Sequence, residues 1–190
     1  AQTMDTKIQD VTKFLPAIFG KDIRRIEMNK SYRNTEPIAA YAASLTGETD
    51  AELFARDGDA VEMRNFSSRE ETLSFVADAF AKEADTTETA SLLFLTEAEA
   101  KAAYRRLEKL FDEKGLSKEQ LSYIDRNSNY FHTGLTVTTF YLAKGLEFET
   151  VYAVTAKDRT DALTNQARYI MATRAMHRLY ICEECKGENE

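Results

Sequence analysis

The spacing of apolar residues predicts strands that alternate with amphipathic helices along most of the chain. Apolar side chains come in short runs or at every second position in the strands, and at every third or fourth position in the helices. Such alternation is typical of a three-layer α/β fold with a mainly parallel sheet and right-handed crossovers. Strands are predicted at 23–28, 60–66, 91–95, 121–124 and 178–182 with two more inside 135–156, and helices within 1–20 and at 37–47, 68–84, 96–114 and 162–176.

Several predicted helices carry start and stop signals. Ser68 with Glu71, and Thr96 with Glu99, have the spacing of a capping box, in which each side chain binds a free backbone amide of the first turn. Gly115 follows the second of these helices and is typical of a residue that ends a helix in the left-handed conformation. The two boxes also explain Ser68 and Thr96 without any ligand.

The stretch 135–156 contains two apolar strand-like runs around a short polar segment, residues 143–148 with the sequence AKGLEF. Loops at the carboxyl ends of parallel strands commonly bind ligands, because helix N-termini and free backbone amides gather there. We therefore expect a site between Thr139 and Glu147, at the carboxyl edge of the sheet.

Composition narrows the classes of function. The 190 residues are 43% hydrophobic, which is enough for one substantial core and a single domain. The net charge of -7 argues against binding nucleic acid by bulk electrostatics, so any such contact must be local. The sequence has neither a membrane-length apolar run nor a signal peptide at its start, and a cytoplasmic protein that does not enter a membrane is expected.

Metal chemistry is not expected in this chain. The two cysteines, Cys182 and Cys185, would need two further ligands to bind zinc, and His132 and His177 do not supply a second ligand pair at a suitable spacing. The sequence also lacks the phosphate-binding motif G-x-x-x-x-G-K-[ST] and a convincing strand that ends in an acid pair for magnesium.

Three segments occur in the order and context of known motifs: SYRNT at 31–35, TFYLAKGLEF at 139–148 and ARYIMATRAMHRLYI at 167–181. Together they resemble motifs IV, V and VI of the UvrD/Rep/PcrA group of superfamily 1 helicases, with features of the HelD-like members. The resemblance covers nearly the whole chain. It implies that residues 1–190 form a single domain, the second of two RecA-like domains, which is called 2A. The chain would then be a fragment of a larger protein.

The resemblance implies a nucleotide-binding role for several residues. Tyr32 matches the aromatic residue that stacks on adenine, and Arg33 matches the arginine that contacts the γ-phosphate. Glu147 matches the acid that binds the ribose hydroxyls, Gly145 allows close backbone approach, and Arg174 matches the arginine finger. In addition, the first four residues look like the end of motif III, where Gln2 would sense the terminal phosphate.

A second group of residues matches positions near single-stranded DNA. Thr139 and Tyr141 match motif V positions, where a hydroxyl can contact phosphate and an aromatic ring can stack on a base. The family commonly has histidine at the position of Tyr141. Thr96, at a predicted helix N-terminus, is a further possible phosphate contact.

The implied function is that of the C-terminal motor domain of an ATP-dependent DNA helicase or translocase. ATP and Mg²⁺ would be bound jointly with an N-terminal RecA-like domain of the same protein, so the isolated chain is predicted to be inactive. The large 2B insertion of many relatives corresponds here only to the loop 125–134, which leaves duplex unwinding open.

The sequence is also compatible with other functions. One is a helicase-like module that mainly binds proteins or remodels RNA polymerase, and another, disfavoured by the missing phosphate loop, is an autonomous nucleotide-binding protein. The plainest alternative for the site itself is that Arg168, Arg174 and Arg178 form one solvated helix face or its end.

Overall fold

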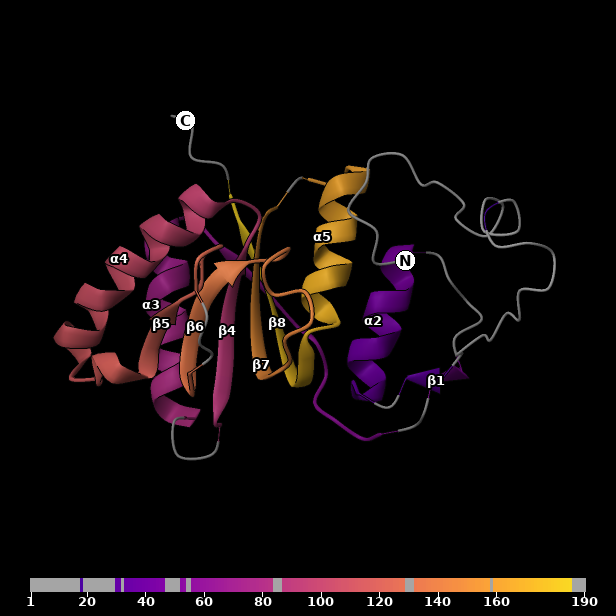
Figure 1. The fold of residues 1–190 in the computed structure, drawn as a ribbon, viewed down its shortest axis with the longest axis horizontal. Coiled ribbons are helices and arrows are strands. Elements are labelled where there is room, and N and C mark those ends of the chain that lie inside the picture. The colour runs from indigo at the N-terminus through magenta and orange to yellow at the C-terminus, as the bar shows by residue number, and fades with distance from the viewer. Residues whose placement is uncertain are drawn as a thin grey trace.

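The chain is organised around a six-stranded parallel sheet with the strand order β3-β8-β7-β4-β6-β5 (Figure 1). Its strands are β3 (Glu62–Phe66), β4 (Thr89–Phe94), β5 (Leu121–Tyr123), β6 (Gly134–Thr139), β7 (Phe148–Ala156) and β8 (Ala175–Glu184). The computed structural model describes residues 18, 30–31, 33–46, 52–53, 56–83, 87–128, 132–157 and 159–185. A second small parallel sheet pairs β1 (Lys30–Ser31) with β2 (Glu52–Leu53).

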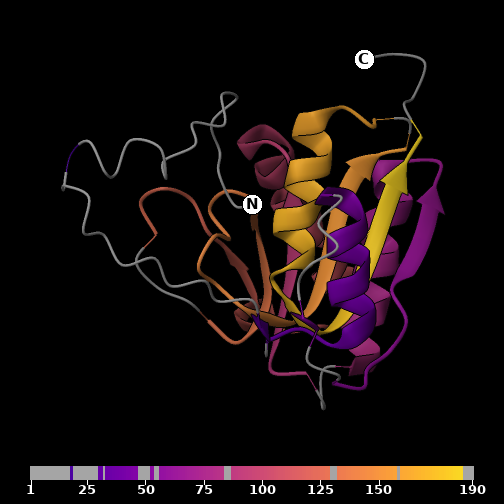
Figure 2. The same ribbon diagram turned by 90° about the vertical axis from the view of Figure 1, so that its right-hand side faces the viewer.

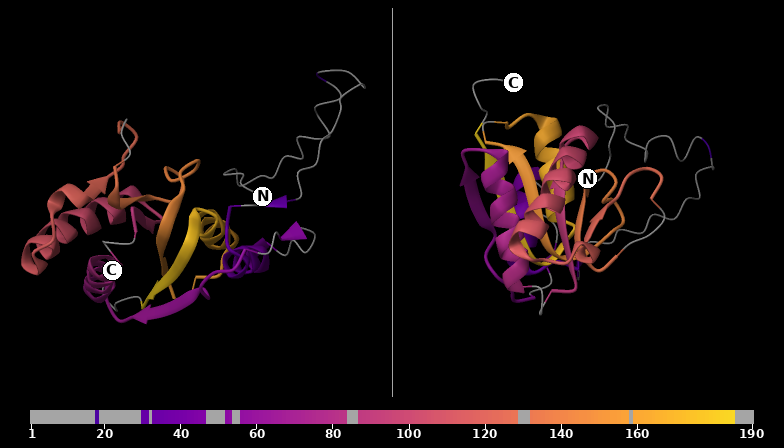
Figure 3. Two further views of the ribbon diagram at one scale, coloured as in Figure 1. Left: turned by 90° about the horizontal axis from the view of Figure 1, so that it is seen from below. Right: turned by 90° about the vertical axis from the view of Figure 1, so that its left-hand side faces the viewer.

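Two helices cover each face of the large sheet (Figures 2 and 3). On one face α3 (Arg69–Glu83) and α4 (Glu97–Lys114) enclose a core around Leu92, Val137 and Tyr152. On the other, α2 (Glu36–Thr46) and α5 (Ala162–Ala172) enclose a core around Leu93, Val151 and Ile181. A short 3₁₀ turn, η1, spans Lys118–Gln120. The predicted three-layer α/β fold is therefore confirmed.

The alternation of strand residues explains how one sheet supplies both cores. Successive side chains of a strand point to opposite faces, so Leu92 and Leu93 of β4 belong to different cores. Because both faces of the sheet are covered, its inner strands are apolar on both sides. Burying this much apolar surface is the main force that holds the layers together.

The predicted helix signals act as expected at α4. Thr96 caps the helix, its hydroxyl accepting from the amide of Glu99 while the Glu99 carboxylate accepts from the amide of Thr96 at 3.0 Å. Gly115 ends α4 in the left-handed region, at φ 69°. At α3 the first half of the box forms, but the Glu71 carboxylate accepts from the amide of Ser67, at 2.9 Å, instead of from Ser68.

The end of α5 differs from the prediction. The apolar pattern continues through Ala175 and Met176 with no glycine or proline, which suggested a helix to residue 176. Instead α5 ends at Ala172, and Ala175 already pairs with Phe148 as the first residue of β8. Tertiary pairing with β7 ends the helix here, so the prediction for 173–176 is wrong. The predicted elements within 1–20 and 23–28 lie outside the described residues, apart from Ile18.

The connection between β6 and β7 contains no helix. It begins with turns in which the amides of Ala143 and Leu146 donate to the carbonyls of Thr139 and Ala143, both at 3.0 Å. The Ala143 side chain is buried in the core beneath α2 and α5. Since β6 and β7 are both parallel to β4, this connection starts at the carboxyl edge of the sheet and ends at the amino edge.

Candidate functional site

Three charged residues that were predicted to bind nucleotide meet at the amino edge of the sheet. Arg33 lies just before α2, Glu147 just before β7, and Arg174 between α5 and β8. The Nε atom of Arg33 lies 2.5 Å from Oε1 of Glu147, and Arg174 is close enough for both of their charges to act on its pKa. The expectation of a single site at the carboxyl edge is therefore wrong for these residues, because the connection carries Glu147 to the opposite edge.

Arg174 is buried, with a relative exposure of only 2%. Its guanidinium donates to the carbonyl of Leu146 at 3.2 Å, to the carbonyl of Ile170 at 3.3 Å and to the hydroxyl of Thr173 at 3.2 Å. These bonds compensate the cost of removing a charged group from water. They also tie Arg174 to the residue that precedes Glu147.

The electrostatics of this cluster favour an anion. Burial lowers the pKa of Arg174, the neighbouring Arg33 charge lowers it further, and the Glu147 carboxylate opposes both effects. Arginine remains protonated at neutral pH despite such shifts. Among these three described residues, two guanidinium groups thus face one carboxylate, so together they carry one excess positive charge, and Arg33 and Glu147 are still partly exposed.

Gly145 supports the local backbone of this site. Its φ of 93° lies in a region that side-chain-bearing residues rarely adopt, so glycine is required by conformation. A Cβ built at this position would meet nothing within 4 Å, so crowding within the chain is not the reason. The open space above Gly145 is compatible with the predicted close approach of a ligand. Tyr32 and Gln2 lie outside the described residues.

The residues predicted to contact single-stranded DNA lie at the opposite, carboxyl edge. Thr139 ends β6 and is 1% exposed, and its Oγ1 atom has no hydrogen-bond partner among the described residues. The Tyr141 hydroxyl donates to Glu97 at 2.6 Å, and Arg126 donates to the same carboxylate oxygen at 2.9 Å. The hydrogen bond from Tyr141, followed by the contact with Arg126, lowers the pKa of Glu97.

The hydroxyl of Thr96 is engaged within the protein. It donates to the Glu99 carboxylate at 2.7 Å and accepts from the Glu99 amide at 3.3 Å. Glu97 and Glu99 both lie in the first turn of α4, where they complement the helix dipole. A phosphate at this helix N-terminus would have to compete with these acids.

Sequence reasoning missed a group of ion pairs along the carboxyl edge. Arg168 is 7% exposed and donates to Glu183 at 2.9 Å and to Thr155 at 3.1 Å. Arg69 donates to Glu184 at 2.7 Å and covers the ring of Phe94. The reading of the α5 arginines as one solvated face is therefore wrong for Arg168, as it is for Arg174. Glu183 and Glu184, the two acids that follow the apolar run of β8, were the sequence feature that could have predicted these ion pairs.

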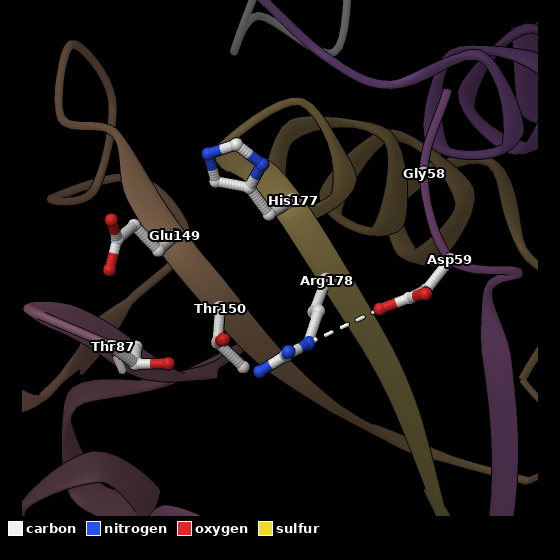
Figure 4. A pocket seen from close by; sticks show the side chains of 7 residues that line it. All are labelled: Gly58, Asp59, Thr87, Glu149, Thr150, His177 and Arg178. Carbon is white, nitrogen blue, oxygen red and sulfur yellow. Dashed lines mark hydrogen bonds and ion pairs between the residues drawn. The ribbon is translucent and has the colours of Figure 1, made fainter. Parts of the chain in front are cut away.

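An open pocket of about 330 Å³ also lies at the amino edge (Figure 4). In its wall Arg178 pairs with the neighbouring Asp59 at 3.2 Å, and Arg178 also pairs with Glu83 at 3.1 Å. Its acidic and basic groups thus partly neutralise one another, and the pocket offers less free positive charge than the cluster around Arg174. It is lined by Gly58, Asp59, Thr87, Glu149, Thr150, His177 and Arg178.

The described residues contain neither a metal-binding cluster nor a membrane-spanning helix. No group of three or more histidine, cysteine, aspartate or glutamate side chains in this part of the chain is arranged to hold a metal ion. Likewise, none of the helices in the described ranges has both the length and the apolar character needed to cross a membrane.

Comparison with known proteins supports a relation to helicases. No protein-family model matches the sequence, and no characterised protein matches it significantly. Among solved structures, the C-terminal domain of a possible DNA helicase from Lactobacillus plantarum WCFS1 is 26% identical, covers 81% of this chain and 88% of its own, and has a TM-score of 0.63. Weaker similarity is found to a CRISPR-associated protein, at 16% identity, 67% and 17% coverage and a TM-score of 0.43. T4 UvsW is 10% identical, and the match covers 68% of this chain and 35% of UvsW with a TM-score of 0.37. The fold and the first of these similarities support a helicase-related C-terminal domain.

Proposed function

We propose that this chain is the second RecA-like domain, 2A, of an ATP-dependent superfamily 1 DNA helicase or translocase of the UvrD/Rep/PcrA and HelD-like type. The observation that carries the proposal is the meeting of Arg33, Glu147 and Arg174 in one site with excess positive charge. These residues come from three separate segments, and each segment resembles a different helicase motif.

In this proposal the cluster completes an ATP site in the cleft with an N-terminal motor domain. That domain would supply the phosphate loop and the acids that hold Mg²⁺. Arg33 would contact the γ-phosphate, and Arg174 would stabilise the charge that develops on the transferring phosphoryl group. A guanidinium suits both roles because it is permanently charged and its fork of donors matches phosphate oxygens. Glu147 and Gly145 would face the ribose, Tyr32 the adenine, and Gln2 the terminal phosphate.

Single-stranded DNA would run along the carboxyl edge, where Thr139, Tyr141 and Thr96 lie. Thr96 is exposed and Tyr141 is half-buried, so a strand could reach them directly, whereas Thr139 is buried with a hydroxyl that has no hydrogen-bond partner among the described residues. The β6–β7 connection joins this edge to Glu147. A change at the nucleotide site can therefore be transmitted to the strand through eight residues of chain, 140–147.

The test is DNA-stimulated ATP hydrolysis by the full-length protein that contains this chain. Arginine fingers contribute about 10³ to 10⁵ in rate, so Arg174→Ala and Arg174→Lys should both lose at least about 10³ in kcat. Arg174→Lys keeps the charge and guards against simple loss of the fold. Arg168→Lys is the matched control, because Arg168 is also a buried arginine and is held by Thr155 and Glu183 at the opposite edge of the sheet. Wild-type ATPase rates in both Arg174 variants would refute the proposal.

A second candidate is a helicase-like module that acts mainly on a protein, such as RNA polymerase. It is favoured by the acidic carboxyl edge, where Glu97 and Glu99 already bind the hydroxyls of Tyr141 and Thr96. An ATPase that is indifferent to single-stranded DNA, but is stimulated by a protein partner and lost in Arg174→Lys, would favour this candidate.

A further inference from the structure

One buried hydrogen bond joins the residue after Arg33 to the residue after Arg174. The side-chain amide of Asn34 donates to the carbonyl of Ala175 at 2.6 Å. Asn34 is 7% exposed and Ala175 is fully buried, so this bond is shielded from water. It joins the turn before α2 directly to the first residue of β8, although the two partners are 141 residues apart in the sequence.

The same point of the backbone also fixes Glu147. The Arg174 guanidinium donates to the carbonyl of Leu146, and the amide of Phe148 donates to the carbonyl of Arg174 at 2.9 Å. These two bonds lie on either side of Glu147. Both partners of the Arg33–Glu147 ion pair are therefore held by hydrogen bonds from their neighbouring residues to the same segment, Arg174 and Ala175.

Residues 56–58 also contact the turn that contains Arg33. Arg56 donates to the carbonyl of Arg33 at 3.3 Å, and the amide of Glu36 donates to the carbonyl of Arg56 at 2.9 Å. Two residues on, Gly58 packs so closely on Thr35 that a Cβ would lie 2.3 Å from its Cγ2. The backbone of this turn is thus held on two sides.

We propose that Asn34 is a positioning residue that sets the place of Arg33 relative to Arg174. This inference rests on the proposed function, and it assigns to Asn34 a task that Arg33 cannot perform itself, since the Arg33 side chain is 41% exposed. Two arginines that act on one phosphate must keep a fixed separation, and an error of about 1 Å can cost about 100-fold in rate. A buried amide hydrogen bond between their neighbouring residues provides such a constraint.

The inference is tested in the full-length protein with Asn34→Ala and with Asn34→Asp, which has the same shape but no amide donor. We expect kcat for ATP hydrolysis to fall about 10- to 100-fold. We also expect weaker binding of a non-hydrolysable ATP analogue and unchanged binding of ADP, because Arg33 acts at the terminal phosphate. A general loss of stability would not separate the two nucleotides. If Asn34→Ala does not fold, Asn34→Asp carries the test, and Asn34→Ser, which retains a donor, should keep more of the wild-type kcat than Asn34→Asp.

Two controls separate positioning from folding. Thr72→Val removes one partly buried side-chain hydrogen bond in α3, from the buried Thr72 to the carbonyl of Ser68, on the other face of the sheet, and should leave the analogue-to-ADP ratio unchanged. In a background of Arg33→Ala, Asn34→Ala should have no further effect on kcat, because a residue that acts through Arg33 has nothing left to position.

The outcomes distinguish the two proposals. If Arg33→Ala loses ATPase activity while both Asn34 variants keep the wild-type kcat and nucleotide ratio, the positioning role is wrong and the proposed function stands. Additive losses in the double variant would also overturn the positioning role. If Arg33→Ala and Arg174→Lys both hydrolyse ATP normally, the proposed function fails and the inference fails with it.

Discussion

Arg33 and Glu147 form an ion pair at 2.5 Å, and both side chains remain more than one third exposed. Exposed ion pairs contribute only about 0 to 1 kcal/mol to stability, because water screens them. This pair is therefore better suited to exchange partners than to hold the fold. Because the pair lies beside the buried Arg174, a ligand that replaced one partner of the pair would also come close to Arg174.

Glu147→Gln should separate function from stability at this pair. The free energy of unfolding should change by no more than about 1 kcal/mol. The rate of ATP hydrolysis by the full-length protein should nevertheless fall, because Glu147 is proposed to bind the nucleotide. Glu62→Gln is the matched control, since Glu62 forms an equally short pair with Arg64 that is slightly more exposed. Equal effects of the two substitutions on ATPase activity would contradict a role for Glu147 at the nucleotide.

Gly58 and Gly115 should respond differently to asparagine. Gly115 has a positive φ and open space around it, so Gly115→Asn should cost little and Gly115→Ala about 1 kcal/mol. At Gly58 the constraint is contact with Thr35, so alanine and asparagine should both destabilise, by about 1 to 3 kcal/mol. Chemical unfolding of the four variants measures this. If asparagine were tolerated at Gly58, the close contact would not constrain the site.

The protein should lose stability at alkaline pH through Tyr180. Burial, and then the charge of Glu83, raise the pKa of Tyr180 to about 12, against about 10 in an unfolded chain. A raised pKa in the folded state stabilises fully below about pH 10, and this stabilisation is lost as the pH rises towards 12, at up to about 1.4 kcal/mol per pH unit. Tyrosinate absorbance and circular dichroism, followed together, should show late ionisation coupled to unfolding. Tyr180→Phe should make unfolding above pH 10 less steep.

Tyr141→Phe should alter the acid at the start of α4. The Tyr141 hydroxyl is the largest influence that lowers the pKa of Glu97, so its removal should raise that pKa towards the ordinary value of about 4.3. The carboxyl resonance of Glu97, followed by NMR between pH 3 and 6, reports the change. Arg126→Gln should raise the pKa of Glu97 as well, because it removes both a hydrogen bond and a positive charge. A larger shift from Arg126→Gln would mean that the ion pair, and not the hydroxyl, controls this acid.

Much of the fold was predictable from local patterns. The α4 helix shows why, because Thr96, Glu99 and Gly115 mark its ends through contacts within a few residues. The end of α5 shows the limit, because Ala175 leaves the helix only to pair with Phe148, and no local signal reports a partner so distant in sequence. The burial of Arg168 was missed for the same reason, since its partners Thr155 and Glu183 come from other strands.

Motif resemblance pointed to the residues of the candidate site but not to its place in the fold. Arg33, Glu147 and Arg174 were found through motif resemblance, and the structure brings them together. Their position at the amino edge follows from a helix-free connection after β6, which the general rule for parallel sheets does not anticipate. Asn34 was overlooked because its partner is a backbone carbonyl, which leaves no mark on the sequence.

The strand order has a consequence for synthesis of the protein. β3, made from residues 62–66, pairs with β8, made from residues 175–184, and β8 lies between β3 and β7. While the ribosome is still adding the residues between them, β3 has no neighbour in this sheet and leaves its backbone groups open to other chains. The sheet is therefore expected to be completed late, when β8 inserts between β3 and β7.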